Sequence, residues 1–346
     1  MFHNNCDIMR EGWLIQHDPD DVGKAQAWKD GIPEEGAKEC IVPSFGHQSF
    51  CDKYGIFWYQ KRFATKFKPN DDQVVLLRIG SADFTTEAYL NGKLVGTHRG
   101  NENPFEFGVT DALDYEGENL LVIRVGKPWA KDVDGYNFWQ VPHRNQRMDI
   151  IWPGHCHNES GISGQVELAL LPKLRITDMY IIANMKTSSV DVEYTVHSDY
   201  TESCVTTLTT RVGNKRTGEQ CNEDSCVKRF EKGDTKVSVS VKLDDVQLWS
   251  TDDPFLYFVH AELVSGERVH RLARHTGFRE FKVGEDGFFY LNGKRLFVRC
   301  SHTGNSFPYS THAIPPSPDF VRRDLYMAKA SGLNTVRFIS GTCLPD

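Results

Sequence analysis

Apolar and polar positions alternate along residues 57–67, with the period of two that is typical of a half-buried β-strand, and residues 74–79 form a more fully apolar run. Further strands are predicted at residues 119–125 and 165–171. Residues 86–98 form a predicted hairpin that turns at Asn91-Gly92, because both positions of such a two-residue turn need positive φ. Residues 1–172 are therefore expected to fold as one all-β domain.

A second group of short strands follows Pro172, and their regular spacing favours a small β-sandwich at residues 173–276. The charged, turn-rich residues 213–235 are expected to be a surface hairpin tip that carries Cys221 and Cys226. The expected strands are 176–183, 190–197, 205–212, 236–243 and 258–264.

The pattern changes again near Gly277. A hairpin is predicted at Asn292-Gly293, followed by a strand at 296–298 and a loop rich in Pro, Ser and His. Ser317-Pro318-Asp319 is a typical helix start, Val321, Leu325 and Ala328 give the helix one apolar stripe, and Gly332 ends it. A further strand at 333–339 completes a βαβ unit.

One βαβ unit cannot close a sheet or bury both of its faces. The apolar strand edges at 296–298 and 336–339 therefore need a cover. We expect either a further C-terminal part or a partner chain to provide it.

Composition argues against a nucleic-acid-binding protein and against a membrane-spanning helix. The net charge of −7, without a Lys/Arg cluster, argues against nucleic acid as a partner, and no apolar run has the roughly 20 residues of a membrane span. Nine cysteines leave at least one thiol without an intrachain partner, and Met-Phe-His-Asn-Asn-Cys-Asp at the N-terminus lacks the features of a signal peptide. A cytoplasmic location is expected, although export with a removed signal stays open.

Short motifs occur in order along nearly the whole chain. In the C-terminal part these motifs are Gly277-Phe278-Arg279, Asn292-Gly293-Lys294, Arg323-Asp324-Leu325 and Gly332-Leu333-Asn334-Thr335-Val336-Arg337. Upstream they are Tyr54-Gly55-Ile56-Phe57-Trp58, Leu90-Asn91-Gly92-Lys93, Gly161-Ile162 and Leu248-Trp249-Ser250. Together they resemble the family 2 glycoside hydrolases, which include β-galactosidases, β-glucuronidases and β-mannosidases. Their common order makes the resemblance specific, although no single motif is.

The resemblance implies a mainly β chain with three parts. A jelly-roll sugar-binding β-sandwich would occupy residues 1–172 and an immunoglobulin-like β-sandwich residues 173–276. Residues 277–346 would begin a (β/α)8 TIM barrel, of which this chain holds only the first βαβ part.

Retaining glycosidases need two carboxylates about 5 Å apart, one as nucleophile and one as acid/base. In the family both are Glu residues at the ends of the fourth and seventh barrel strands. No Asn-Glu pair occurs after residue 277, and a barrel takes about 250 residues. The catalytic pair is therefore expected to be absent, and the chain alone to be inactive; no cofactor is implied.

The first edge of the active site is what the resemblance leaves to this chain. Arg337 would charge-pair with and orient the nucleophile; the alternative is a structural salt bridge. The family usually has Arg-Gly-x-Asn after the first barrel strand, whereas this chain has Arg299-Cys300-Ser301-His302. His302 and Asn305 are therefore candidate sugar contacts, with ordinary loop residues as the equal alternative.

Residues 127–163 form a long, aromatic-rich stretch with little periodicity, and such loops are usually functional when they are not disordered. Its candidate substrate-binding residues are Asp134, Tyr136, Trp139, His143 and Arg144. Aromatic faces stack on pyranose rings and charged groups bind hydroxyls. The alternative is a loop that packs on its own aromatics.

His155-Cys156-His157 with Glu159 has no second cluster, so no metal site is predicted. Three functions stay open: the N-terminal portion of a retaining β-glycosidase, a non-catalytic carbohydrate-binding protein, or one subunit of a split glycosidase. All three have a β-glycoside carbohydrate as partner, and the sequence does not identify the sugar.

Overall fold

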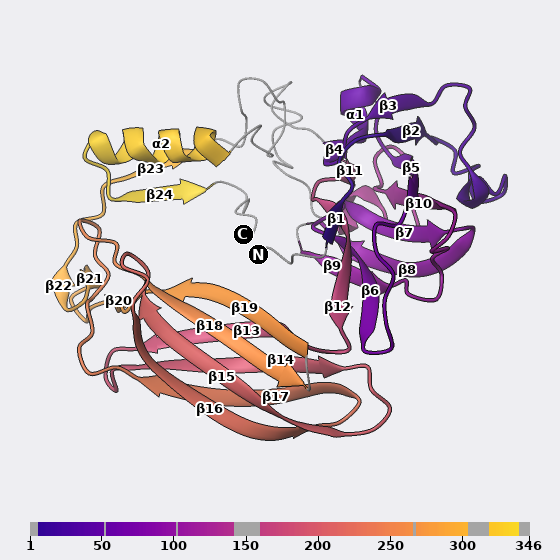
Figure 1. The fold of residues 1–346 in the computed structure, drawn as a ribbon. Helices are drawn as coiled ribbons and strands as arrows, with labels where there is room; N and C mark the ends of the chain where they lie inside the picture. The colour runs from indigo at the N-terminus through magenta and orange to yellow at the C-terminus, as the bar shows by residue number, and fades with distance from the viewer. Residues whose placement is uncertain are drawn as a thin grey trace. The chain divides into compact units, whose positions relative to one another are not determined.

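The computed structural model describes residues 6–51, 53–101, 103–141, 160–265, 268–303 and 318–338, and it is mainly β (Figure 1). The chain divides into two compact units, with the break between Leu170 and Leu171. The second unit continues to His302 and includes Val321–Arg337.

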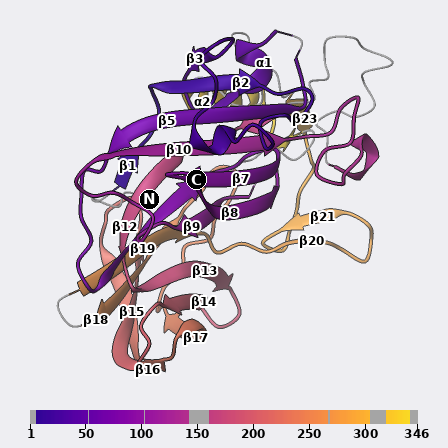
Figure 2. The same ribbon diagram turned by 90° about the vertical axis from the view of Figure 1, so that its right-hand side faces the viewer.

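The first unit is built around a six-stranded sheet in the order β3-β2-β5-β10-β7-β8 (Figure 2). All neighbouring strands in it are antiparallel. Its strands are β2 (Trp13–His17), β3 (Lys38–Cys40), β5 (Ile56–Ala64), β7 (Phe84–Leu90), β8 (Lys93–Gly100) and β10 (Glu118–Gly126).

A four-stranded sheet, β1-β12-β6-β9, and a two-stranded pair, β11-β4, complete this unit. Their strands are β1 (Cys6–Ile8), β4 (Ser44–Phe45), β6 (Gln73–Ile79), β9 (Phe105–Gly108), β11 (Gly161–Ile162) and β12 (Val166–Pro172). Short helices lie at α1 (Gly46–Ser49), η1 (Trp28–Asp30) and η2 (Phe138–Gln140).

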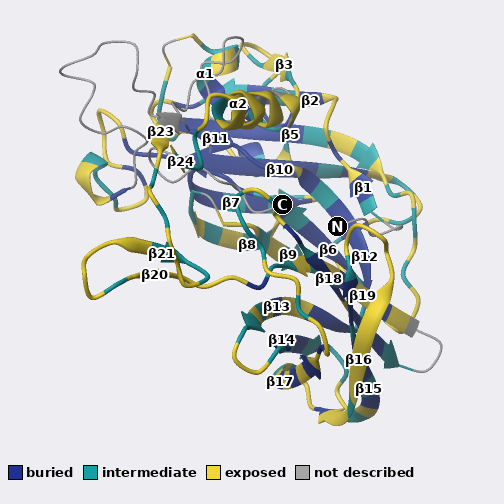
Figure 3. Cartoon of the chain, turned by 90° about the vertical axis from the view of Figure 1, so that its left-hand side faces the viewer, coloured by how far each residue is buried: buried dark blue, intermediate teal, exposed yellow. Residues whose placement is uncertain are grey.

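The main core of the first unit lies between the larger sheets. Phe57 and Tyr59 from β5 pack with Leu121 and Ile123 from β10, and with Leu77 from β6. A second apolar cluster includes Trp28, Trp58 and Val122. Because β5 and β10 contribute residues to both clusters, both strands are buried on two faces (Figure 3). Double-sided burial explains why the first part of β5, Ile56–Tyr59, is continuously apolar and does not alternate.

The second unit starts as two packed sheets, β13-β14-β17 and β16-β15-β18-β19. Ile176 and Val192 from the first share one core with Leu208 and Val259 from the second. The strands are β13 (Leu174–Asn184), β14 (Ser189–Ser198), β15 (Cys204–Asn214), β16 (Gln220–Phe230), β17 (Gly233–Lys242), β18 (Tyr257–Ser265) and β19 (Arg268–Thr276). The five strands expected from the sequence are present, and β16 and β19 are additional.

The expected hairpin tip at 213–235 is wrong. Most of it is β16, which pairs antiparallel with β15 from Cys204↔Phe230 to Gly213↔Gln220. Its residues are almost all exposed, so the strand has no apolar face that alternation could reveal. Cys221 and Cys226 are both free. They stand five positions apart on this strand, an odd spacing that points their side chains to opposite faces.

The C-terminal part contains two small strand groups and one helix. β20 (Phe281–Val283), β21 (Phe289–Leu291) and β22 (Lys294–Arg295) form one group, and β23 (Cys300–Thr303) and β24 (Thr335–Phe338) the other. Helix α2 (Pro318–Ala330) lies between β23 and β24 in the chain. Among the described helices, none combines the length and apolar character needed to cross a membrane.

Turn predictions are confirmed where the turn chemistry is explicit. Asn91-Gly92 and Asn292-Gly293 all have positive φ, between 51° and 76°, as two-residue hairpin turns require. Gly332 follows α2 with φ 83°, and Pro318 is the first helical residue. Ser317, the expected N-cap, lies outside the described residues.

The strand expected at 296–298 is wrong in position. Those residues have no regular structure, and β23 starts at Cys300. Asn334 holds the segment before it. The Asn334 amide donates to the carbonyl of Phe297 at 2.9 Å, and its Oδ1 accepts from the backbone N–H of Arg299 at 2.9 Å.

Candidate functional site

The segment after β10 is an ordered loop as far as Val141, the last described residue before the gap. Asp134 and Gly135 have φ 49° and 82°, and Val133 and Tyr136 exchange two backbone hydrogen bonds of 2.9 Å. This is a two-residue hairpin. Asn137 then caps η2 by accepting a hydrogen bond from the Trp139 N–H at 3.0 Å. We call residues 127–141 the anchored loop.

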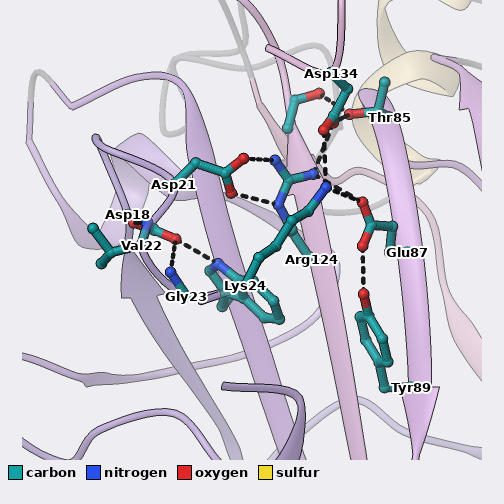
Figure 4. A network of polar contacts seen from close by, with 12 residues as sticks. Asp18, Asp21, Val22, Gly23, Lys24, Thr85, Glu87, Tyr89, Arg124 and Asp134 are labelled. Carbon is teal, nitrogen blue, oxygen red and sulfur yellow. Dashed lines mark hydrogen bonds and ion pairs between the residues drawn. The ribbon is translucent and has the colours of Figure 1, made fainter. Parts of the chain in front are cut away.

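A network of charges attaches the hairpin to the sheet (Figure 4). Arg124 is completely buried, and its Nη1 donates to Asp134 Oδ2 at 2.7 Å. Lys24 Nζ lies 3.1 Å from the other carboxylate oxygen, and Thr85 Oγ1 donates to Oδ2 at 2.5 Å. Asp134 thus connects β10, β7 and the segment that contains Lys24.

The two cations of this network have further partners. Arg124 binds Asp21 through two parallel hydrogen bonds of 3.0 and 2.9 Å, and Lys24 lies 2.6 Å from Glu87. Two cations therefore share three carboxylates. Such multiple pairing offsets the cost of removing buried charges from water.

The network changes the acidity of its members. Burial opposes ionisation of Asp134, but hydrogen bonds from Arg124 and Thr85 and the positive charge nearby outweigh it and lower its pKa to about 2. For Arg124 too, burial disfavours the charged form, yet Asp134 and the other carboxylates raise its pKa. Asp134 is consequently ionised throughout the neutral range.

The segment that supplies Asp21 and Lys24 is itself fixed by a buried carboxylate. Asp18 accepts hydrogen bonds from the backbone N–H groups of Val22 at 2.8 Å and Gly23 at 2.9 Å. It also accepts one from the indole N–H of Trp58 at 2.9 Å. These hydrogen bonds to the Asp18 carboxylate hold the turn against β5.

A second buried ion pair fixes the start of the anchored loop. Lys127 follows β10 directly and Asp83 precedes β7, and their side chains are 1% and 2% exposed. Lys127 Nζ donates to Asp83 Oδ2 at 2.7 Å. The loop is therefore held at its start by the Lys127–Asp83 ion pair and at its hairpin by the charges around Asp134.

Aromatic side chains lie along the same loop. Tyr136 packs edge-on against Phe84, with ring centroids 5.5 Å apart, and its hydroxyl accepts a hydrogen bond from Arg99 at 2.5 Å. Tyr54, Trp129, Phe138 and Trp139 form a continuous series with centroid separations of 4.9, 5.5 and 5.2 Å. We call these four residues the aromatic row.

The candidate residues named from sequence have different positions. Asp134 and Tyr136 are held by protein partners, whereas Trp139 is 79% exposed. Arg337 lies in β24 with its side chain exposed, and no carboxylate among the described residues is in ion-pair range of it. His302 is in β23, where its backbone alone is described, and Asn305, His143 and Arg144 lie outside the described residues.

The residues His155, Cys156, His157 and Glu159 also lie outside the described part of the chain. Within that part, no group of three or more His, Cys, Asp or Glu side chains could hold a metal ion.

The sequence candidates included Asp134 but not its partners Arg124 and Lys24, and they included one residue of the aromatic row, Trp139, but not the other three. Arg124 interrupts the apolar run of β10, and a charge in such a run signals a buried ion pair. Asp134-Gly135 is itself a hairpin signal. Trp129 carried no periodic signal, and the pairing of Lys24 with Glu87 had no signal at all because it depends on tertiary structure.

The chain is similar to known proteins over nearly its whole length. Residues 174–279 match the glycosyl hydrolases family 2, and residues 33–128 match the β-galactosidase second all-β domain. A β-galactosidase of Thermoanaerobacter pseudethanolicus is 28% identical over 94% of this chain and 42% of its own length. A β-glucuronidase of Streptococcus agalactiae is 26% identical over 72% of this chain and 39% of its own length.

A solved structure, the β-glucuronidase of Bacteroides uniformis, matches the fold with a TM-score of 0.76 at 20% identity. The match covers 99% of this chain and 40% of that one. The mainly β arrangement is thus that of a glycoside hydrolase, and the chain spans less than half the length of these relatives. Together the family models and the relatives support a member of glycoside hydrolase family 2.

Proposed function

We propose that this chain is the N-terminal portion of a retaining β-glycosidase that hydrolyses O-glycosidic bonds in β-galactosides or β-glucuronides. The observation that carries the proposal is a match over 94% of the chain to a β-galactosidase, together with matches to β-glucuronidases. Within the proposal, the first unit corresponds to a jelly-roll sugar-binding domain and residues 173–276 to an immunoglobulin-like domain. β23, α2 and β24 correspond to the start of a (β/α)8 barrel.

In the proposal, hydrolysis and sugar binding belong to different parts of the protein. The catalytic Glu pair would belong to later barrel strands, so these 346 residues would bind sugar or shape the site without hydrolysing a bond. Arg337 supports this arrangement because it is exposed at the end of β24, free of a carboxylate partner among the described residues. In the proposal it pairs with the nucleophile, and His302 and Asn305 line the same edge.

The test compares two proteins made from the same source DNA. One is the 346-residue chain, and the other is the product of the whole reading frame that contains it. We expect no release of p-nitrophenol from aryl β-galactosides or β-glucuronides by the first, and concentration-dependent release by the second. Hydrolysis by the 346-residue chain itself would contradict the proposal.

A non-catalytic carbohydrate-binding protein is the second candidate, favoured by the exposed aromatic row. A reading frame without the Glu pair, whose product binds glycosides but hydrolyses none, would establish it. If hydrolysis appears only after a second chain is added, the protein is one subunit of a split glycosidase. In that case the partner would cover the exposed apolar side chains Phe297, Tyr326 and Met327.

A further inference from the structure

Strand β16 of the second unit has one open side. It ends the sheet β16-β15-β18-β19, and no described strand pairs with its other side (Figure 1). Nine of its eleven residues are exposed, Cys226 is half-buried and only Phe230 is buried. The open side of such a strand presents backbone N–H and C=O groups that another strand can bind.

The backbone groups of the odd-numbered residues point to this open side. The N–H groups of Glu223 and Ser225 each donate to the side-chain Oδ1 of the preceding residue, at 2.9 and 2.8 Å. Neither donor is therefore bonded to β15. Because N–H groups alternate in direction along a strand, that of Val227, a residue 70% exposed, faces the same way.

The charges of β16 are ordered along the strand. Glu223 and Asp224 stand in its first half, and Lys228 and Arg229 in its second half. Both pairs are centred on Cys226, two and three positions away from it on either side. A second copy of the strand, turned end for end about Cys226, thus sets a cation opposite each of these carboxylates.

We propose that β16 pairs antiparallel with β16 of a second copy of this chain, with Cys226 of the two copies opposite each other. Asp224 then faces Lys228 of the second copy and Glu223 faces its Arg229, and the two-fold symmetry forms each pair twice. Carbonyl groups of the second copy replace side-chain oxygens as acceptors for the open N–H groups. The Asp224 carboxylate is thereby released to bind Lys228.

The charges specify this register against its neighbours. A centre at Asp224 or at Lys228 sets that residue opposite its own copy, so that like charges meet. A centre at Ser225 forms no ion pair, and a centre at Val227 sets Glu223 opposite Glu231. Like charges directly opposite each other destabilise a strand pair, so only the centre at Cys226 is favoured.

A single pair of strands is a small interface, so we expect a dissociation constant in the micromolar range that rises with salt. The test is sedimentation velocity of the 346-residue chain over roughly 1 to 100 μM, which spans the affinities of small interfaces. A dimer should form as the concentration rises.

Charge reversal tests the register. Asp224→Lys and Lys228→Asp should each weaken the dimer about tenfold or more, because like charges then meet at two places. An equimolar mixture of the two variants should associate about as tightly as the wild type. In a mixed dimer, Lys at position 224 faces Asp at position 228, and the other pair again joins opposite charges.

Val227→Pro tests the backbone pairing. It removes an N–H that faces the open side and leaves the ladder to β15 intact, so the chain should fold and its dimer weaken about tenfold or more. Lys186→Asp is the control, since Lys186 is exposed in the turn between β13 and β14 and the variant has the same net charge as Lys228→Asp. It should dimerise like the wild type, and thermal unfolding shows that each variant is folded.

Three results would overturn the proposal. A chain that stays monomeric over the whole range does not pair through β16. If Asp224→Lys and Lys228→Asp associate as tightly as Lys186→Asp, another surface makes the contact. If both variants are weakened and their mixture does not recover, the register is wrong. None of these results bears on hydrolysis, so the proposed function is tested separately.

Discussion

At the scale of single residues, Arg124 shows how one buried charge organises a surface loop. Its guanidinium is fully buried, yet it contacts Asp21, Glu87 and Asp134. A buried ion without partners is strongly destabilising, so the fold must bring carboxylates to it from three other segments. The same contacts that neutralise Arg124 therefore determine where the anchored loop lies.

Asp134→Asn should destabilise the chain by about 2 kcal/mol at neutral pH, because its pKa is lowered from 3.8 to about 2. The folded-state pKa is the lower one, so ionised Asp134 stabilises the fold above about pH 4. That contribution is lost as the pH falls towards 2. Urea unfolding at several pH values measures the effect; the difference between variant and wild type should shrink with acidification.

Asp132→Asn is the control, since Asp132 is an exposed residue of the same loop. It should unfold like the wild type at every pH. If the free energy of unfolding of Asp134→Asn and of Asp132→Asn depended on pH in the same way, the network would not stabilise the loop.

Lys127→Met should destabilise the first unit by about 3 to 5 kcal/mol, because it leaves the buried carboxylate of Asp83 without its cation. Lys68→Met removes an ion pair whose side chains are 67% and 82% exposed, and it should have almost no effect. Chemical denaturation compares the two. A similar small loss for both would show that burial does not strengthen the Lys127–Asp83 pair.

At the scale of elements, close backbone contacts connect segments of the first unit that are far apart in the sequence. Gly164 lies between β11 and β12, and its N–H donates to the carbonyl of Ser81 at 2.9 Å. The hydroxyls of Ser81 and Ser163 are 2.7 Å apart. These contacts fix the segment after β6 against the segment before β12, next to the Asp83 that holds Lys127.

Gly164→Ala should therefore cost about 3 kcal/mol or more, because overpacking against backbone cannot relax by a side-chain rotation. A Cβ at this position would lie 2.2 Å from the Ser81 nitrogen. Gly108→Ala is the matched control, as nothing lies within 4 Å of its added Cβ. Thermal unfolding of both variants makes the comparison, and equal melting temperatures would disprove the close approach.

At the scale of the whole molecule, two β units with separate cores precede a C-terminal part of different character. Helix α2 exposes Leu325, Tyr326 and Met327, at 41%, 73% and 63%. The relatives that the chain matches are more than twice as long as the matched part. Exposed apolar side chains on α2 fit the proposal that further protein packs on β23, α2 and β24.

Arg337→Ala, introduced into the product of the whole reading frame, should lower kcat about a hundredfold or more if Arg337 pairs with the nucleophile. Arg337→Lys should recover only part of this, because lysine cannot form a bidentate pair. Steady-state kinetics on an aryl β-glycoside gives both values. Arg229→Ala, an exposed arginine of β16, is the control, and an unchanged kcat in Arg337→Ala would leave Arg337 a structural residue.

The sequence alone determined the mainly β class, the Asn-Gly hairpins, the limits of α2 and the family, because each depends on local chemistry or on ordered motifs. The tertiary structure alone decided which charges meet. Lys24, Glu87, Arg124 and Asp134 have no common periodicity. Glu87 and Arg124 meet when β7 and β10 pair, and Lys24 and Asp134 come from two further segments. It also decided that β16, almost wholly exposed, is a strand, because that strand depends on hydrogen bonds to β15 and not on an apolar face.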